Sequence, residues 1–186
     1  STYPFFIPKI YKMSVLTTGR KLPSKKSVGG LKAIYFGDYG SLGTVTIVAG
    51  EITAFSASPD FFKYDINGSS SLETTVNSSK DAGSIFYTQT LNVSLLYLDK
   101  ATQEEIKLVA TARPHVIVED YNGNFLSVGL RNGTETTGGS IVTGAAMGDA
   151  QSFTLTMEAM EINPPFFILA SIIPALTSIH QITPTA

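Results

Sequence analysis

The side chains that could do chemistry in this 186-residue sequence are few and far apart. The sequence contains no cysteine, which excludes thiol nucleophiles, disulfide bonds and zinc–thiolate sites, and its two histidines are His115 and His180. His115 and Glu119 alternate along an expected strand and would lie about 13 Å apart, because a strand rises about 3.3 Å per residue. A general base and the group that orients it need hydrogen-bond contact. We therefore interpret His115 as a partly buried strand histidine and assign no role to His180.

Two loops and one pair of carboxylates have only part of the pattern of a binding site. Residues 120–124 (DYNGN) place oxygens at alternate positions, as a calcium loop does, but glycine stands at the fourth place and no glutamate at the twelfth. The glycine-rich residues 144–149 (GAAMGD) lack the Gly-Lys-Ser/Thr of a phosphate loop. Glu158 and Glu161 fall on opposite faces of an alternating strand. The sequence therefore predicts a protein that is not an enzyme and that has neither a metal site nor a cofactor.

The composition indicates a chain that covers part of its surface with partners. Charged residues make up 15% of the sequence, against an average of about 25%. Obligate assemblies bury such charge-poor surfaces; a monomer with a polar surface rich in Ser, Thr and Gly is the alternative. Residues 166–179 form an apolar run that is too short to span a bilayer, and Pro174 interrupts it. We expect no membrane span, and we expect residues 166–186 to be an arm that lies on another surface.

The charge is unevenly distributed, although the net charge is only −2. Residues 1–36 contain seven bases and no acid, whereas residues 37–186 contain all fifteen acids and six bases, a net charge of −9. A basic arm on an acidic body can pair with the body of a neighbouring copy or with nucleic acid. Only Tyr11 is interleaved with the bases, so pairing between subunits is the preferred interpretation. The seven bases are Lys9, Lys12, Arg20, Lys21, Lys25, Lys26 and Lys32.

Residues 1–30 are expected to form an extended arm, because prolines and the pair Gly29-Gly30 interrupt any periodicity. Residues 31–165 contain alternating apolar and polar stretches bounded by turn residues, which is typical of strands. The expected body is mainly β, with about eight to ten strands and one helix. The expected strands cover residues 31–36, 44–49, 51–57, 61–76 (a weaker region with a possible turn or bulge at residues 67–68), 85–97, 115–119, 125–130, 141–143 and 152–158, and loops cover residues 77–84 and 131–139.

The longest strand signal covers residues 85–97. Six of its seven odd positions are apolar, whereas the even positions are mostly Thr, Asn and Ser. Fully extended, this strand would measure about 45 Å, well beyond the usual length of about five or six residues. Such a strand suits a broad sheet or an assembled barrel wall; a long bent strand in an ordinary sandwich is the alternative. The residues assigned to this wall are Ile85, Tyr87, Leu91, Val93, Leu95 and Tyr97.

The helix is expected at about residues 102–112. Thr102 and Glu105 match a capping box, and an apolar stripe follows them. Pro114 ends the helix, because proline disfavours the helical conformation of the residue before it. The dipeptide Asn122-Gly123 is the strongest short signal for a hairpin. The sequence therefore predicts one flanking helix, followed by a meander of strands.

Residues 138–165 are expected to supply the closing strand of the sheet. A glycine-punctuated turn leads into an alternating strand, and Pro164 and Pro165 end it, because proline cannot donate to a ladder. This spacing resembles the C-terminal region of bacteriophage tail tube (major tail) proteins, and residues 113–120 (RPHVIVED) with the hairpin that follows are similar to virion proteins of this kind. The resemblance covers about residues 85–165. Its motif consists of Gly144, Gly148, Asp149, Phe153, Thr154, Leu155 and Thr156.

The resemblance implies a β-sandwich or β-barrel with a flanking helix. Six copies would form a ring in which long strands, from about residues 60–76 and 85–98, join into one inner barrel, and stacked rings would form a tube that conducts DNA. An acidic lumen would repel phosphates and let DNA slide. The protein would then be part of the virion, assemble in the host cytoplasm, and contact its own copies and other tail proteins. The residues expected between rings come from the basic arm and the loop at residues 77–84, and are Lys9, Lys12, Arg20, Lys21, Lys25, Lys26, Lys80 and Asp81.

Other functions share part of this pattern. A capsid decoration protein would have the same composition but would form trimers or bind a capsid, and a tail terminator or baseplate ring would also form rings. A carbohydrate-binding β-sandwich normally exposes aromatic residues, often Trp, and this sequence has no Trp. An enzyme on a β scaffold is the weakest alternative, because no catalytic set is present. If residues 85–97 form the wall, aspartate at Leu91 and Val93 is expected to abolish assembly.

Overall fold

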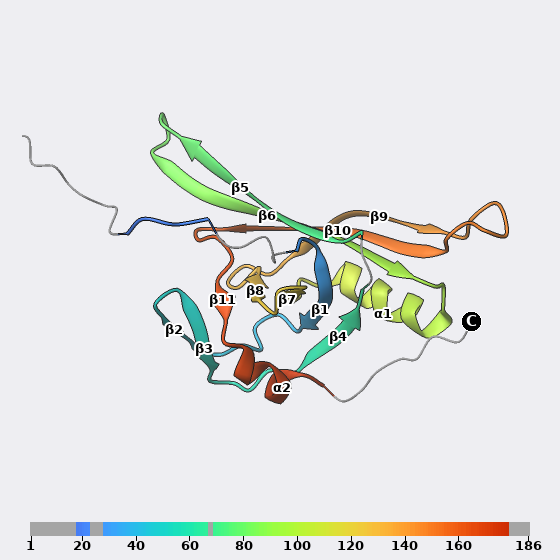
Figure 1. Cartoon of the computed structure of the whole chain (residues 1–186), viewed down its shortest axis with the longest axis horizontal. Coiled ribbons are helices and arrows are strands. Elements are labelled where there is room, and N and C mark those ends of the chain that lie inside the picture. The colour runs from blue at the N-terminus through green and yellow to red at the C-terminus, as the bar shows by residue number, and fades with distance from the viewer. Residues whose placement is uncertain (1–17, 23–27, 67–68, 179–186) are drawn as a thin grey trace, which may run out of the picture.

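The protein is a mainly β sandwich of two sheets with short helices beside them, which confirms the expected fold class (Figure 1). The computed structural model describes residues 18–22, 28–66 and 69–178. The larger sheet has the order β2 (Val45–Val48), β3 (Glu51–Phe55), β11 (Phe167–Ile168), β8 (Phe125–Val128), β7 (His115–Asp120), β1 (Leu31–Gly37) and β4 (Phe61–Asp65). The smaller sheet has the order β5 (Ser71–Ser79), β6 (Ser84–Leu96), β10 (Ser152–Glu161) and β9 (Glu135–Val142). The helices are α1 (Lys100–Thr111), the 3₁₀ turn η1 (Ala170–Ile172) and α2 (Ile173–Leu176).

The main core lies between the two sheets. It combines Ile34 of β1 and Val118 of β7 with Leu91 of β6 and Phe153 of β10, and Ile106 of α1 belongs to the same cluster. Each such apolar side chain contributes about 1.5–3 kcal/mol when it is fully buried. The four-stranded sheet therefore has one face fixed by the core of its own subunit.

A second cluster covers the opposite face of the seven-stranded sheet. Tyr35 of β1 and Ile117 of β7 pack there with Ile168 of β11 and with Ile173 and Leu176 of α2. Because β1 and β7 are buried on both faces, their sequences contain continuous apolar runs instead of an alternation. The four-stranded sheet therefore lies on one outer side of the described chain, and α2 lies on the far side of the seven-stranded sheet (Figure 1).

The long strand expected at residues 85–97 is β6, which has 13 residues. Leu91 is in register with Leu72 of β5 on one side and with Met157 of β10 on the other. Leu91 and Val93 are buried, while the intervening even positions are half-exposed, so the expected alternation is confirmed. The strand is central in its sheet and pairs along most of its length with both neighbours.

The strand region expected at residues 61–76 consists of two strands, and the two belong to different sheets. Residues 61–65 are β4 in the larger sheet, whereas residues 71–79 are β5 in the smaller sheet. Only the second part pairs with β6, and it continues through residues 77–79, which had been expected to be loop. Ser and Asn are poor strand formers in isolation, but cross-strand pairing outweighs this weak preference, since strand propensity depends on context.

The flanking helix is confirmed, but its start is not where the capping box places it. α1 begins at Lys100, and the side chain of Asp99 accepts a hydrogen bond from the backbone N–H of Thr102 at 3.1 Å. Thr102 is therefore buried in the first turn instead of capping it. Asp is at least as good an N-cap as Thr, and it comes three residues earlier. A second helix, the four-residue α2, was not predicted.

The meander after α1 has the expected hairpin at Asn122-Gly123, which joins β7 to β8. Residues 135–142 form β9, so the expected loop at residues 131–139 ends earlier and the strand is longer. β10 is not a closing strand, because it pairs with β6 on one side and β9 on the other. Its buried residues at every second position nevertheless confirm the predicted alternation.

The segment after Pro165 is part of the body, in contrast to the expected C-terminal arm. Residues Phe167 and Ile168 form β11, which lies between β3 and β8 in the larger sheet. Ile173 and Leu176 are buried in the second cluster. Pro174 interrupts no larger helix, since it lies in the first turn of α2, where proline is tolerated. The expected arm from residue 166 is thus wrong up to Ser178, and residues 179–186 lie outside the described residues.

Candidate assembly surface

The four-stranded sheet has two open edges. β5 pairs only with β6, and β9 pairs only with β10, so each presents one row of backbone groups that no described strand satisfies. Natural proteins usually protect such edges with lysine, proline or bulges. The nine residues of β5 contain neither lysine nor proline and pair with β6 without a register shift. β9 has one register shift, beside Thr136, and a regular stretch from Gly138 to Val142.

The outer face of this sheet is mostly polar and has no basic side chain; its exposed apolar side chains, Phe86, Leu96, Val142 and Met160, lie toward the ends of the strands. The even positions of β6 and β10 point away from the core, and they include Thr90, Asn92, Thr154 and Thr156. Thr156 donates a hydrogen bond to the Oδ1 atom of Asn92 at 3.1 Å. The four strands contain no Lys, Arg or His. Their four glutamates are Glu73, Glu135, Glu158 and Glu161.

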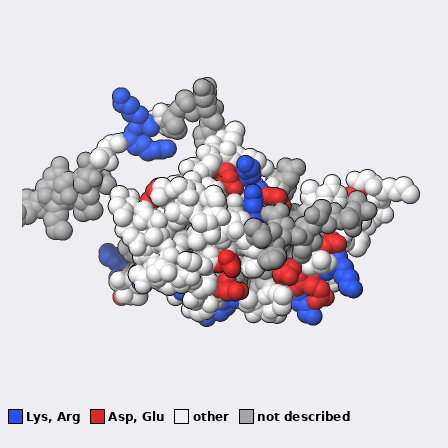
Figure 2. All heavy atoms as spheres, turned by 90° about the horizontal axis from the view of Figure 1, so that it is seen from below, with Lys and Arg blue, Asp and Glu red and all other residues white. Residues whose placement is uncertain are grey.

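Two of these glutamates point outward without a partner cation in the described chain. Glu73 and Glu158 are both in register with Thr90, on the two sides of β6. Glu135 is in register with Glu158, and its carboxylate lies 3.5 Å from Arg113. Glu161 is buried on the core side. By contrast, the opposite face of the molecule has acidic and basic side chains together (Figure 2). The absence of bases is therefore a property of the four-stranded sheet.

The sheet extends beyond the core that it covers. By the alternation of their strands, Val76 of β5, Ile85 of β6 and Ile141 of β9 lie on the core side of the sheet, yet they are 62%, 60% and 54% exposed. The β5–β6 hairpin projects past the rest of the body (Figure 1). Apolar side chains on the covered side of a sheet edge favour burial against another surface.

The residues assigned to an inner wall divide into two groups. Leu91, Val93 and Leu95 lie in β6 with their side chains buried in the core of the same subunit. Tyr87 is half-buried, while Ile85 and Tyr97 are exposed. Tyr97 follows the end of β6 and has a positive φ of 69°. Aspartate at Leu91 and Val93 would therefore unfold the subunit. Loss of assembly in such a variant would not show whether the exposed side of β6 makes contacts between copies.

The residues expected between rings are described only in part. Lys80 and Asp81 lie exposed in the turn at the tip of the β5–β6 hairpin. Arg20 and Lys21 are exposed, and the remaining arm residues Lys9, Lys12, Lys25 and Lys26 lie outside the described residues. The arm reaches the body at Val28, whose backbone N–H and C=O both bind the side chain of Asn122.

The motif residues form a rigid turn and a core strand. In the turn at residues 144–149, the Oδ2 atom of Asp149 accepts hydrogen bonds from the N–H groups of Ala146 and Ala145 at 2.8 and 2.9 Å. These two bonds lower the pKa of Asp149, and the bond from Ala146 has the larger effect. Gly144 has a φ of 79°, and a Cβ there would lie 2.8 Å from the Cβ of Asp149. Phe153 and Leu155 are buried, and Thr154 and Thr156 lie on the outer face.

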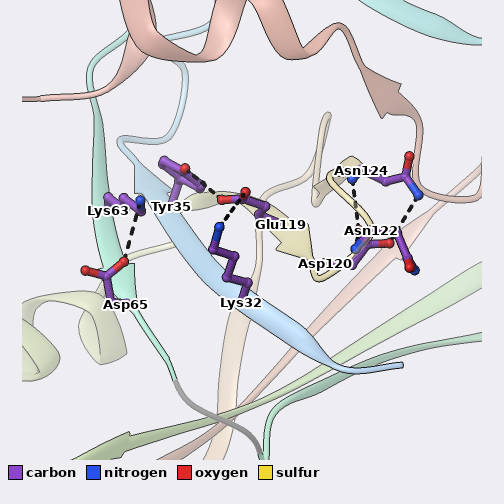
Figure 3. Close-up of polar contacts among 8 residues, drawn as sticks. All are labelled: Lys32, Tyr35, Lys63, Asp65, Glu119, Asp120, Asn122 and Asn124. Atoms are coloured by element: carbon purple, nitrogen blue, oxygen red, sulfur yellow. Dashed lines mark hydrogen bonds and ion pairs between the residues drawn. The ribbon is translucent and has the colours of Figure 1, made fainter. Parts of the chain in front are cut away.

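The calcium-like residues 120–124 are explained by the hairpin itself. The Oδ1 atom of Asp120 accepts hydrogen bonds from the N–H groups of Asn122 and Asn124 at 2.9 and 2.8 Å, and Oδ2 accepts one from the side chain of Asn124 (Figure 3). The described residues contain no group of three or more acidic or His side chains placed to hold a metal ion. The oxygens of this loop are therefore engaged in fixing the turn.

A small polar cluster lies on β1, β4 and β7. The hydroxyl of Tyr35 donates to the Oε2 atom of Glu119 at 3.3 Å, and the Nζ atom of Lys32 lies 3.9 Å from Oε1 of the same carboxylate (Figure 3). Lys63 and Asp65 form a separate ion pair at 3.5 Å. Burial raises the pKa of Tyr35, and the negative charge of Glu119 makes a smaller contribution in the same direction. Each of these groups is paired within the subunit, and we interpret the cluster as structural.

His115 is buried at the start of β7 and both of its ring nitrogens have partners. The Nε2 atom accepts a hydrogen bond from the N–H of Gly40 at 3.1 Å, so Nδ1 carries the proton and donates to the carbonyl of Gly129 at 2.7 Å. The ring of Tyr39 stacks on the imidazole at 5.3 Å between centroids. The predicted strand histidine is confirmed, and it is more buried than the partial burial expected. His180 lies outside the described residues.

Sequence reasoning missed the polar side chains that connect the two sheets. Gln89 of β6 accepts a hydrogen bond from the N–H of Gly129 at 3.0 Å and donates to the carbonyl of Asn163. Glu161 of β10 accepts from the N–H groups of Arg131 and Asn132 at 3.0 and 2.9 Å. The signal was visible, because both residues occupy core-side positions in strands that otherwise alternate. They hold the turn at residues 129–133 against the four-stranded sheet.

None of the described helices is long and apolar enough to cross a membrane. No family model, curated protein or solved structure matches the chain. A function is therefore inferred mainly from the geometry of the four-stranded sheet.

Proposed function

We propose that this protein is a structural virion protein whose copies join edge to edge into rings, and that stacked rings form a tail tube through which DNA passes. One observation carries the proposal: the four-stranded sheet has two long open edges, a polar face without bases, and apolar side chains that overhang the core. The resemblance of residues 85–165 to tail tube proteins supports the same function.

The directions of the strands allow the sheet to continue from copy to copy. Within the sheet each strand is antiparallel to its neighbour, so β5 and β9 run in opposite directions. When copies are related by rotation about an axis parallel to the strands, each strand keeps its direction. β9 of one copy then meets β5 of the next in the antiparallel sense. Each junction then repeats the pairing found inside the subunit. Such a head-to-tail contact closes into a ring when the rotation allows it.

The size of the resulting barrel is sufficient for a channel. Six copies of the four-stranded sheet would give 24 strands. At about 4.8 Å between strands, the backbone would enclose a barrel about 37 Å across before any tilt. Barrels of about 16–18 strands already leave an aqueous channel. The core of each subunit covers the outside of this barrel, and its polar face lines the lumen.

The chemistry of that face suits the passage of a polyanion. Binding of DNA comes mainly from Lys and Arg at phosphates, and the four strands contain neither. The hydroxyl and amide groups of the outer face are neutral, and Glu73 and Glu158 add negative charge. A lumen of this kind repels phosphates and offers no site at which DNA would stop.

Electron microscopy of the purified protein tests the proposal. Rings with a central channel, or tubes of stacked rings, are the expected result. A protein that stays monomeric at high concentration, or forms only trimers, would refute it. Rings that never stack under any condition would favour a tail terminator or baseplate ring, and binding to capsids as trimers would favour a decoration protein.

A further inference from the structure

We propose that the turn at residues 144–149 of one copy inserts Met147 into a hollow beside Tyr39 on a copy in the adjacent ring. The inference rests on the proposed function and assigns the contact that stacks one ring on the next. It concerns two features that the ring itself does not use: a fully exposed methionine on a hydrogen-bonded turn, and a partly apolar hollow at the other end of the molecule.

Met147 is presented to solvent by a turn that is fixed from within. Its relative exposure is 109%, the highest of the large apolar side chains in the described chain. The two hydrogen bonds to Asp149 and the positive φ of Gly144 hold the turn without any contact to Met147. Ordering a segment beforehand reduces the entropy lost on association. The turn is therefore suited to act as a preformed knob.

The hollow has a volume of about 460 Å³. Its apolar walls come from Leu42, Val45, Ile47 and Leu130, and the exposed ring of Tyr39 forms part of the rim. This volume lies in the range of about 300–1,000 Å³ that is usual for ligand pockets. Methionine fills irregular apolar gaps well and makes favourable contacts between its sulfur and aromatic rings. The hollow can therefore receive the side chain of Met147 and part of the turn around it.

The charges of the two surfaces are complementary. Asp149 is the only charged residue between β9 and β10, and the lowered pKa of its carboxyl keeps it ionised. The hollow is lined by Arg131, while the guanidinium of Arg113, which pairs with Glu135, lies beside it, 5.3 Å from the centre of the Tyr39 ring. Opposite charges at the rim of an interface favour correct orientation and suppress wrong contacts. A second copy of this chain is thus the occupant that both the apolar and the charged residues fit.

The positions of knob and hollow place the contact along the strands. The turn at residues 144–149 lies at the end of the sheet where Val142 pairs with Ser152, opposite the β5–β6 tip where Ser79 pairs with Ser84. In Figure 1 this turn is at the right end of the molecule, and β2, which supplies Val45 and Ile47, is at the left. A knob at one end and a hollow at the other make a head-to-tail contact that does not close and so continues from ring to ring.

The variant Met147→Ser in the full chain tests the inference, with Met160→Ser as the control. Met160 is also exposed, at 56%, but it lies on β10 far from the turn. We expect Met147→Ser to form rings as the unchanged protein does, and to need about tenfold more protein to form tubes, which corresponds to about 1.4 kcal/mol. Arg131→Glu should weaken stacking in the same way, because within the described residues Arg131 donates a hydrogen bond through its backbone N–H and its side chain forms no ion pair. Ring and tube populations are measured by sedimentation and electron microscopy.

The outcomes separate this contact from the proposed function. If Met147→Ser and Arg131→Glu both form rings and tubes as readily as the unchanged protein, the inference is overturned and the proposed function stays in place. Loss of the rings themselves in a folded Met147→Ser would also overturn it, since the contact would then lie within a ring. A protein that forms no rings at all would refute the proposed function, and the inference with it.

Discussion

Single residues decide how the two sheets are held together. Gln89 is 2% exposed, and its amide satisfies the N–H of Gly129 and the carbonyl of Asn163. Glu161 serves the backbone of the same turn from β10. A buried backbone group that loses its partner costs more free energy than the bond contributed. These two side chains thus set the position of the turn at residues 129–133 relative to the four-stranded sheet.

Replacing Gln89 by leucine is expected to destabilise the subunit by about 1–3 kcal/mol, because the buried N–H of Gly129 loses its acceptor. Thr90→Leu is the matched control. Thr90 is the next residue in β6, faces outward, and should change stability by less than about 0.5 kcal/mol. The free energy of unfolding in urea measures both. Equal stability of the two variants would show that the Gln89 bond is not made in solution.

Tyr64 should make the folded protein less stable at alkaline pH. Burial raises the pKa of Tyr64 from 10.0 to about 12, and the negative charge of Glu105 makes a smaller contribution in the same direction. Between these values the folded state keeps a proton that the unfolded state has lost, so stability falls as pH rises from about 10 to 12. Tyr64→Phe removes this part of the loss, on the order of 1–2 kcal/mol. Thermal unfolding of both proteins at pH 8 and pH 11 measures it; a Phe variant that loses as much stability as the parent would contradict the assignment.

Among the elements, two glycines in the turn between β8 and β9 have different roles from a glycine within β9. Gly133 has a φ of 70°, and a Cβ there would lie 2.5 Å from the carbonyl oxygen of Arg113. Gly138, in β9, has no atom within 4 Å of the position of a Cβ. Gly129 has a φ of 65° and is as crowded as Gly133, in the same turn. The turn requires glycine for its path, whereas the edge strand does not.

Alanine at these positions should have opposite effects. Gly133→Ala is expected to destabilise the subunit by more than about 2 kcal/mol, because it combines a left-handed conformation with a backbone clash. Gly138→Ala should be neutral or stabilising by up to about 1 kcal/mol, since alanine restricts the unfolded chain. Chemical denaturation of the two variants is the measurement. If Gly138→Ala were the more damaging, the conformation described for this edge would be wrong.

The elements also show what the sequence could predict. β6 and β10 were predictable because each buries one face, so their alternation is directly visible in the residue types. β11 was not, because its two residues lie in an apolar run with no period and acquire strand structure only from β3 and β8. The start of α1 was misplaced because Asp99 and Thr102 are both good N-caps. Local patterns thus gave the strands, while their partners depended on contacts distant in sequence.

The same limit applies to the candidate surface. A polar face on the long strand was evident from Thr90 and Asn92, and the structure shows this face on the outside of the sheet. The open edges could not be predicted, because the order β5-β6-β10-β9 places a hairpin beside two strands that follow about forty residues later. Leu91 lies in the strand assigned to the assembly wall, and its side chain is buried in the core of its own subunit, which a strand pattern alone does not reveal.

At the scale of the whole molecule, assembly should depend on the overhanging apolar residues of both edges. In the double variant Val76→Lys and Ile141→Lys, lysine on each edge opposes strand pairing and removes apolar contact with the neighbouring copy. We expect a folded monomer and no rings. Leu108→Lys, on the exposed side of α1, is the control, because Leu108 is 60% exposed and Val76 is 62% exposed.

Sedimentation velocity and electron microscopy measure the assembly state, and circular dichroism checks that each variant is folded. Rings formed equally well by the double variant and by Leu108→Lys would contradict the edge-to-edge arrangement. Loss of rings in Leu108→Lys alone would place the contact on α1 instead.

The position of β11 has a consequence for the order in which a newly made chain becomes competent. β3 pairs with β2 and β11 among the described strands, and β11 is the last of them to leave the ribosome. A two-stranded hairpin alone is only marginally stable, so β2 and β3 attach to the body after all other strands have been synthesised. Val45 and Ile47 of β2 line the hollow, which is therefore completed late. A nascent chain would thus be unable to accept a neighbour's Met147 before its own sheets are finished, and incomplete chains would be kept out of a growing tube.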